Sequence, residues 1–169
     1  LSHSSAASDV YKRQILALPY DLEHLISFKF WEEDFFWVSH RLNKNAGKAE
    51  IKASELEQSE LMLLEDGHCL KDHILDACNI SSSTQYTLKA SSLNTLIQLV
   101  KGEMGTTLVP KMALRELIGN KDKLSISHLN EPGPHREIVL ITRPNFAGME
   151  SIGMLINFFN RSLKEFNNI

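Results

Sequence analysis

The sequence predicts an α/β fold, and three observations lead to that prediction. Short runs of aliphatic and aromatic residues, each long enough for one strand, recur along the chain. Between them lie segments of about ten residues with apolar positions at helical spacing. With 169 residues, of which 43% are hydrophobic and 23% charged, the chain has the composition of a domain with a buried core. No run approaches the roughly 18 consecutive apolar residues that a membrane span requires.

Several segments have the composition of strands, and one of them indicates how the strands pair. Residues 61–64, LMLL, form a continuous apolar run, which suits a strand buried on both faces. Since such strands belong to parallel or mixed sheets and helices separate many of the segments, we expect a largely parallel sheet. In chain order the expected strands are 14–18, 25–31, 34–40, 61–64, 85–89, 106–109, 124–129 and 137–142.

Helices are expected between these strands, with capping residues at their ends. Ser92 can cap a helix that Gly102 ends, and Pro110 stands just before the helical run 111–118. The last helix begins near Met149 and keeps apolar residues at i, i+3, i+4 and i+7, so it must lie on a sheet. The other expected segments are helices at 53–58, 69–78 and 92–101, and a loop at 41–52.

The first 14 residues, LSHSSAASDVYKRQ, do not resemble part of the fold. They are polar and rich in serine, they lack the apolar core of a secretion signal, and they resemble translated adapter sequence. We therefore expect residues 1–14 to be a non-native or disordered leader and the natural chain to be truncated at its N-terminus. Two cysteines and the missing signal peptide indicate a reducing cytoplasm, where any disulfide is transient.

The charge of the chain argues against a nucleic-acid surface of its own. Its formal net charge is −3, whereas neutralising phosphates requires a basic face. If DNA is a partner, another segment must hold it.

The segment LLEDGHCLKDHILDAC, residues 63–78, is the densest cluster of reactive side chains. Asp66 and Gly67 are typical turn residues, and they follow the carboxyl end of a buried strand. Ligand sites lie at that end of the strands in open parallel sheets. Cys69 would begin the following helix, where the positive end of the helix dipole and the nearby Lys71 both favour a thiolate. The pattern predicts a reactive cysteine at a cleft.

The second cysteine, Cys78, lies nine residues further on. In an intact helix nine steps correspond to about 13.5 Å of rise and about 900° of rotation, so the two sulfurs point in opposite directions. A disulfide requires Cα atoms within about 7 Å, so the pair can close only if much of the helix unwinds. This geometry suits a switch better than a structural bridge.

Simpler interpretations compete with a reactive pair. A cytoplasmic cysteine is more often a small buried hydrophobe, and Cys78 fits that description. Asp66 and Asp72 can equally be helix-start residues that satisfy backbone donors, and His24, His40, His128 and His135 are expected to be solvated. A metal site is conceivable, although its spacing matches no usual zinc pattern; its ligands would be Glu65, His68, Cys69, His73 and Cys78.

Three stretches resemble the OxyR family, the peroxide-sensing LysR-type transcription regulators. They are LMLLEDGHCLKD with a second cysteine nine positions after the first, ASSLNTLIQLVKGEMGTTLVP, and HREIVLITRP. The resemblance covers about residues 15–166. Its GHCL[RK]D block with this cysteine spacing is specific, whereas the glycine-rich stretch is shared by LysR-type regulators that sense small molecules.

The resemblance implies a two-lobed effector domain like a periplasmic binding protein, with the first lobe truncated. Residues 34–135 would form the second lobe, and residues 15–33 and 136–169 part of the first. The family's N-terminal helix-turn-helix would be missing, so DNA would be bound only through that missing part. The family also implies a cytoplasmic homo-oligomer, dimer or tetramer, that contacts RNA polymerase and carries no cofactor or metal.

The resemblance also implies roles for individual residues. Cys69 would be the peroxidatic cysteine, whose sulfur attacks hydrogen peroxide and becomes a sulfenic acid, and Cys78 would resolve it to a disulfide. His68, Asp72 and Arg136 would surround the peroxide. Glutathione or thioredoxin-type reductants would reset the switch. Lys71 stands where the family usually has Arg, which keeps the charge and loses the planar fork.

Two other classes of protein fit parts of the sequence. A thiol peroxidase would turn over peroxide, but the usual peroxiredoxin P-x-x-x-[TS]-x-x-C pattern does not precede Cys69, so we expect a regulator rather than an enzyme. The main alternative is a LysR-type effector domain that binds a small metabolite between its lobes and whose cysteines are inert.

Overall fold

The chain forms two units and passes from one to the other twice. The computed structural model describes residues 13–19, 22–81, 88–118 and 123–167. Unit 1 comprises Leu1–Glu32 and Glu137–Ile169, and unit 2 comprises Glu33–Arg136. None of the described helices is long and apolar enough to span a membrane.

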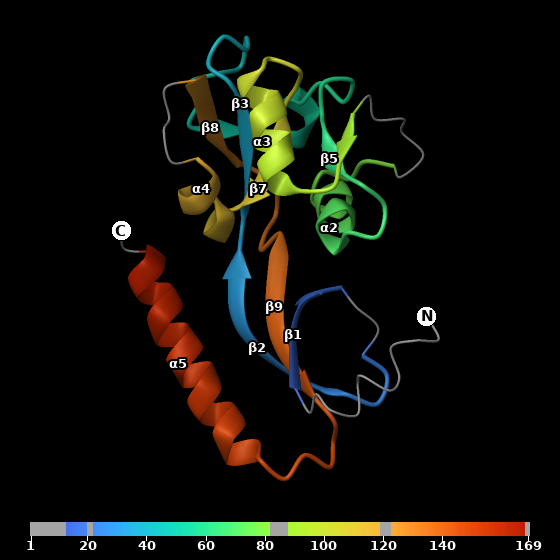
Figure 1. The fold of residues 1–169 in the computed structure, drawn as a ribbon, viewed down its shortest axis with the longest axis vertical. Helices are drawn as coiled ribbons and strands as arrows, with labels where there is room; N and C mark the ends of the chain where they lie inside the picture. Colours follow the sequence, from blue (N-terminus) through green and yellow to red (C-terminus); the bar gives the residue numbers. More distant parts are fainter. Residues whose placement is uncertain (1–12, 20–21, 82–87, 119–122, 168–169) are drawn as a thin grey trace. The chain divides into compact units, whose positions relative to one another are not determined.

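Unit 1 is a small sheet with one long helix (Figure 1). Its elements are β1 (Arg13–Leu18), β2 (Ile26–Glu33), β9 (Arg136–Thr142) and α5 (Met149–Asn167), with β2 and β9 each extending one residue into unit 2. The strand order is β1-β9-β2, and β1 runs antiparallel to β9. The rings of Phe30 and Phe159 lie 5.2 Å apart, and Ile152 is buried. The apolar face of α5 therefore packs on the sheet, as its periodicity predicts.

The start of β1 corrects the expected extent of the leader. Arg13 and Gln14, which we placed in the leader, pair with Thr142 and Ile141 of β9. They are part of the fold because β9 offers a partner for each of them. The rest of the leader, residues 1–12, lies outside the described residues.

Unit 2 is built on a mixed sheet of order β4-β8-β3-β7. These strands are β3 (Phe35–His40), β4 (Glu50–Ile51), β7 (Thr107–Pro110) and β8 (Leu124–Leu129). Beyond β7, Leu61 bridges Thr106 in parallel. The adjacent β5 (Leu63–Leu64) runs parallel to β6 (Lys89–Ala90). Of the strand expected at 85–89, Lys89 lies in β6, and residues 85–87 lie outside the described residues.

The expected largely parallel sheet is wrong. Strand β3 is antiparallel to both β7 and β8, and only the short pairs made by β4, β5 and Leu61 are parallel among the pairings described in this unit. The reason is topological. Strand β3 follows the crossing into unit 2 and β8 precedes the crossing out, so these adjacent strands run in opposite directions.

The helices of unit 2 cover a continuous apolar core. They are the 3-10 turn η1 (Ala53–Glu55), α2 (Cys69–Ala77), α3 (Leu93–Lys101) and α4 (Lys111–Leu117). Ser92 Oγ accepts a hydrogen bond from Thr95 N–H at 3.2 Å and Gly102 ends α3, both as predicted. The fully buried side chains include Phe35, Val38, Leu61, Leu63, Leu96, Ile97, Leu108 and Leu129.

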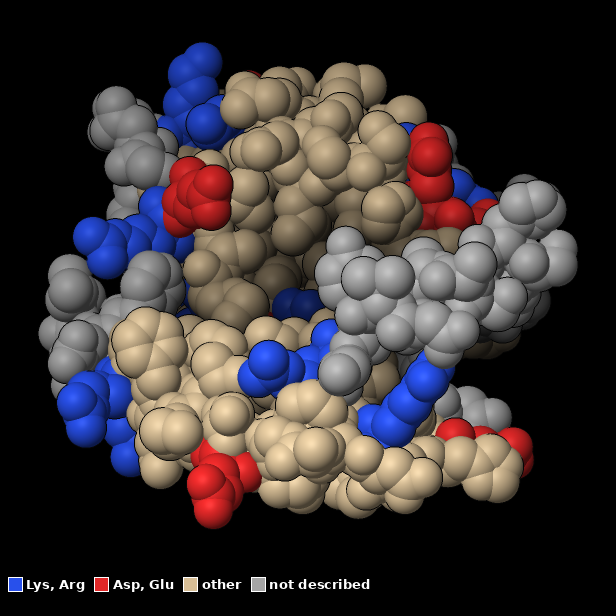
Figure 2. All heavy atoms as spheres, turned by 60° about the horizontal axis from the view of Figure 1, so that its bottom comes forward, with Lys and Arg blue, Asp and Glu red and all other residues tan. Residues whose placement is uncertain are grey.

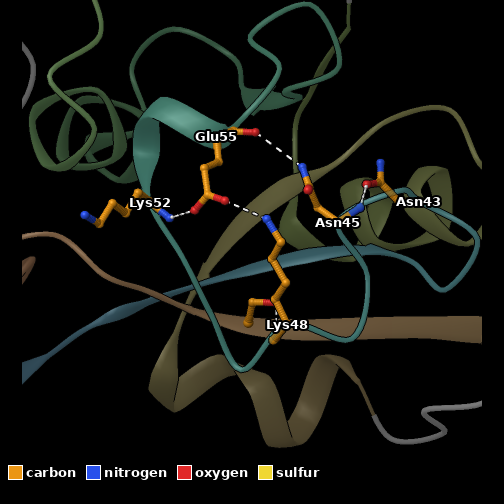
Figure 3. A network of polar contacts seen from close by, with 6 residues as sticks. Asn43, Asn45, Lys48, Lys52 and Glu55 are labelled. Atoms are coloured by element: carbon orange, nitrogen blue, oxygen red, sulfur yellow. Dashed lines mark hydrogen bonds and ion pairs between the residues drawn. The ribbon is translucent and has the colours of Figure 1, made fainter.

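The segment expected to be the loop 41–52 is more ordered than its composition indicates (Figure 3). The Glu55 carboxylate accepts hydrogen bonds from Lys52 N–H at 2.9 Å and from Lys48 Nζ at 2.6 Å, and its carbonyl accepts from Asn45 Nδ2 at 3.4 Å. These contacts bring the segment back to the sheet, where Glu50 and Ile51 pair with β8 as β4.

Shortening a core side chain beside the Cys69 turn is expected to destabilise the protein. Leu63→Ala removes a side chain that is fully buried, so the free energy of unfolding should fall by about 2–5 kcal/mol. The matched control is Leu42→Ala, at a side chain that is 74% exposed, which should change it by less than about 0.5 kcal/mol. Urea denaturation of both variants measures the difference, and equal values would contradict the core described here.

Candidate functional site

Cys69 begins helix α2 at the end of a tight turn that leaves β5. Glu65 N–H donates to Ala90 O at 3.0 Å, which extends the β5–β6 pairing by one residue. Gly67 then takes a φ of 96°, a left-handed conformation that favours glycine. His68 is the extended N-cap residue, and Cys69 is the first residue of the helix and exposed. The turn therefore presents this sulfur to solvent at a helix N-terminus.

Lys71 does not serve Cys69 in the way the sequence led us to expect. Its ammonium pairs with Asp66, which also accepts from Lys89 Nζ at 2.9 Å. These two lysines hold the pKa of the Asp66 carboxyl down at about 2. Two helical steps place Lys71 about 160° from Cys69 around the helix axis. Asp66 thus links α2 to β6 through two ion pairs and does not cap the helix.

Cys78 is the chemical opposite of Cys69. It is the C-cap residue of α2, its N–H donates to Ile74 O at 3.0 Å, and it is only 7% exposed. Burial raises the pKa of the Cys78 thiol to about 12, and the Glu131 carboxylate adds to the effect. Both cysteines are free. The predicted geometry, with the two sulfurs at opposite ends and on opposite sides of one helix, is confirmed.

The remaining predicted site residues differ in their surroundings. His68 and Asp72 are exposed beside Cys69, and no side chain caps the helix at His68. Arg136 lies at the start of β9, and its Nη1 donates to Glu33 Oε1 at 3.2 Å. The structure thus brings His68 and Asp72 to Cys69, whereas the Arg136 guanidinium is already held by a carboxylate.

The partner of Arg136 is a buried carboxylate that was not among the predicted site residues. The Glu33 side chain is fully buried, and its Oε2 accepts from Met112 N–H of α4 at 2.9 Å. Burial raises the pKa of Glu33, while Met112 N–H and Arg136 act in the opposite direction. This pair joins the first and last residues of unit 2.

His73 is the other residue of the site that the sequence identified only as a conceivable metal ligand. It lies on α2 and is 2% exposed, and its Nδ1 has no hydrogen-bond partner within the described part of the chain. Burial and the Arg136 guanidinium lower its pKa. The signal in the sequence was its position four residues after Cys69, on the same helix face.

Two histidines that we expected to be solvated are structural. The His135 side chain is 1% exposed; its Nδ1 accepts from Phe35 N–H at 3.0 Å and its Nε2 contacts Glu131 O at 3.1 Å. His128 Nε2 lies 3.1 Å from Asp34 Oδ2. The prediction failed because Phe35 and Asp34, which contact these two histidines, are far away in sequence.

No described group of three or more His, Cys, Asp or Glu side chains is arranged to hold a metal ion. Two cavities, of about 550 Å³ in unit 1 and about 350 Å³ in unit 2, are lined by residues other than the cysteines. On the face shown in Figure 2, the described Lys and Arg side chains are interspersed with acidic and uncharged ones and form no continuous basic surface.

The chain resembles proteins of one family along most of its length. The family model "LysR substrate binding domain" matches residues 14–164. The HTH-type transcriptional regulator EstR of Acinetobacter baylyi is 34% identical over 149 residues, which cover 87% of this chain and 49% of that protein. A protein of Streptomyces viridosporus named "Probable hydrogen peroxide-inducible genes activator" is 33% identical over 135 residues, covering 79% of this chain and 43% of the relative.

A solved structure has the same fold. A mutant of Corynebacterium glutamicum OxyR with H2O2 bound superposes with a TM-score of 0.83 at 30% identity, covering 94% of this chain and 51% of that chain. The mixed α/β fold thus matches that of OxyR proteins. The chain spans about half the length of the curated relatives it matches.

Selective alkylation should separate the two thiols. In the native protein at pH 8, iodoacetamide is expected to modify Cys69 at least about tenfold faster than Cys78, because Cys69 is exposed and Cys78 is buried with a pKa raised to about 12. The rate at Cys78 should rise only as the pH approaches 12. Peptide mass spectrometry measures both rates, and 6 M guanidinium, in which the rates should converge, is the control. Equal native rates would remove the asymmetry.

Proposed function

The chain belongs to the LysR substrate-binding domain family, and on that premise we propose that it is the redox-sensing effector domain of a hydrogen-peroxide-inducible transcription regulator, switched by a reversible Cys69–Cys78 disulfide. The observation that carries the proposal is the asymmetry of α2, which begins at an exposed thiol and ends at a buried one. The similarity to a peroxide-inducible activator and to OxyR supports the same assignment.

The chemistry proceeds in two balanced steps. The Cys69 sulfur attacks one peroxide oxygen; an S–O bond forms, the O–O bond breaks, and the other oxygen leaves as water after taking the proton that the thiol gives up. The product is a sulfenic acid. The Cys78 sulfur then attacks the Cys69 sulfur, a disulfide forms, and the sulfenic oxygen leaves as a second water. Glutathione or a thioredoxin-type protein reduces the disulfide and resets the domain.

The second step requires a change of fold. A helix with the bounds of α2 separates the Cα atoms of Cys69 and Cys78 by about 13.5 Å along its axis, whereas a disulfide needs them within about 7 Å. Cys78 must also leave the core, because its sulfur is buried. Oxidation therefore unwinds α2, and this conformational change is the signal passed to the rest of the regulator.

We assign supporting roles to three polar residues around Cys69. His68 and Asp72 form the exposed rim beside the sulfur. Arg136 binds Glu33 through Nη1, and its buried Nε has no hydrogen-bond partner among the described residues. That N–H is the group we assign to the charge that develops on the leaving oxygen.

The other partners lie outside this chain. A net charge of −3 leaves DNA to a helix-turn-helix segment of the regulator. The regulator acts in the cytoplasm as a dimer or tetramer, and it transmits the signal to RNA polymerase. We infer a regulator rather than an enzyme, since the similar proteins are named as transcription regulators and activators and the peroxiredoxin pattern does not precede Cys69.

One observation favours a second function. EstR is also similar over most of the chain, and its name assigns it to transcription regulation and does not mention peroxide. The alternative is an effector domain that binds a small metabolite and has inert cysteines. The two functions differ in whether a small amount of peroxide oxidises Cys69 and Cys78.

Cysteine substitutions should assign the two roles. In the full-length regulator, Cys69→Ser is expected to abolish the response to peroxide, whereas Cys78→Ser should accumulate sulfenic acid at position 69 because no resolving thiol remains. Dimedone labelling followed by mass spectrometry detects the sulfenic acid. A dimedone adduct in Cys69→Ser but not in Cys78→Ser would reverse the roles, and no oxidation in the wild-type regulator would favour the metabolite sensor.

Substitution of Arg136 should test whether its Nε–H donates a hydrogen bond to the leaving oxygen of peroxide. Arg136→Lys keeps a positive charge for Glu33 and removes Nε–H, so the second-order rate constant of Cys69 oxidation should fall about tenfold or more, as loss of a charge-assisted hydrogen bond implies. Stopped-flow measurement gives the rate constant. Arg115→Lys, at an exposed position of α4, is the matched control. An unchanged rate constant in Arg136→Lys would restrict Arg136 to its structural pair with Glu33.

A further inference from the structure

Cys69 and His73 are neighbours on one face of α2. Four helical steps bring their Cβ atoms to about 5–6 Å, and their directions differ by about 40° around the axis. Cys69 is exposed and His73 is 2% exposed. The pair therefore lies at the boundary between the solvent-facing and the buried side of the helix, with the imidazole one turn below the sulfur.

The His73 ring carries an unused polar atom. Nδ1 is buried and has no hydrogen-bond partner among the residues that the structure describes. A buried polar atom without a partner is costly, so most such atoms in proteins are paired. An imidazole kept in this state beside an exposed thiol fits a group whose partner is engaged during a reaction.

The charges around His73 keep the ring in its proton-accepting form. Arg136 faces it from β9 and lowers its pKa, as burial does, while Asp72 and Asp76 on α2 itself act in the opposite direction. The net effect is a pKa below the usual value, so the neutral ring predominates at pH 7. A neutral imidazole with an open Nδ1 can accept a proton.

The adjacent histidine has none of these properties. His68 precedes the helix, is exposed, and neighbours Cys69 only along the chain. Residues one position apart do not face each other on a helix. Its imidazole belongs to the solvated rim.

We propose that His73 is the general base for Cys69: its Nδ1 accepts the thiol proton as the sulfur attacks and then returns that proton to the leaving oxygen. The inference rests on the proposed function for its oxidant, hydrogen peroxide. One S–O bond forms, one O–O bond breaks, and the thiol proton ends on the water that leaves. The sulfur is oxidised, the peroxide oxygens are reduced, and His73 ends neutral as it began.

The test compares two histidine substitutions in the full-length reduced regulator with Cys78→Ser, so that only Cys69 reacts. His73→Gln keeps a polar side chain and loses the base; His40→Gln, at a histidine of β3, is the matched control. The rate of Cys69 modification is measured from pH 5 to pH 10 with hydrogen peroxide and, separately, with iodoacetamide. Thermal unfolding shows whether each variant is folded.

The expected result is a change in the shape of the pH profile. At pH 7, His73→Gln should react with both reagents at least about tenfold more slowly, and the pH of half-maximal rate should rise by about one unit or more. Recovery at high pH, where solvent removes the thiol proton, identifies a lost base. His40→Gln should follow the parent. If His73→Gln unfolds, His73→Ala is measured with added imidazole, which should restore the rate at pH 7.

The possible negative results distinguish failure of the His73 proposal from failure of the proposed function. A parental profile in His73→Gln, or an equal loss of rate at every pH, would overturn the role of His73 and leave the peroxide switch untouched. No rescue of His73→Ala by imidazole would also overturn it. A profile that depends on His73 for iodoacetamide, in a protein that peroxide does not oxidise, would instead support the base and contradict the proposed function.

Discussion

Packing of the inner face of α2 against the core of unit 2 is the interaction on which the behaviour of both thiols depends. Leu70, Ile74, Leu75 and Cys78 all belong to that core. Full burial of a leucine or isoleucine stabilises a fold by about 1.5–3 kcal/mol, whereas a disulfide that closes a short loop contributes about 2–4 kcal/mol. Exposing Leu70, Ile74 and Leu75 together would cost about 4.5–9 kcal/mol, which is more than the disulfide contributes. The packed helix is therefore the favoured state once the disulfide is gone, so a reductant that removes the disulfide allows α2 to form again.

Two buried or bridging carboxylates, Asp66 and Glu33, hold the elements around α2 in place. Asp66 forms ion pairs with Lys71 and Lys89 and so links α2 to β6. Glu33 engages Arg136 and Met112 N–H, which ties both crossings of the chain to the start of α4. Removing Arg136 outright would leave a buried carboxylate unpaired, which costs several kcal/mol. Such residues cannot be assigned to catalysis from truncations alone, and this is why the conservative Lys substitution is informative.

The sequence was most informative where structure is set by neighbouring residues. The Gly67 turn, the start of α2 at Cys69, the Ser92 cap and the end of α3 at Gly102 were all predicted, because each depends on a few consecutive residues. Predictions failed where the partner is distant. The direction of β3 relative to β8 and the burial of His135 against Phe35 depend on the tertiary fold. His73 lay between these cases, since its spacing from Cys69 was visible and its burial was not.

The fold by itself does not decide between a peroxide sensor and a metabolite sensor, because one architecture supports several functions. The distinction rests on the sites of the two thiols. An inert cysteine usually behaves as a small hydrophobe inside the protein, and Cys78 fits that pattern in the reduced chain. Cys69 does not, since it is exposed at a helix N-terminus with a buried imidazole one turn away. The proposed switch requires that arrangement, because its thiol must meet peroxide and then reach Cys78, whereas the binding of a metabolite does not depend on it.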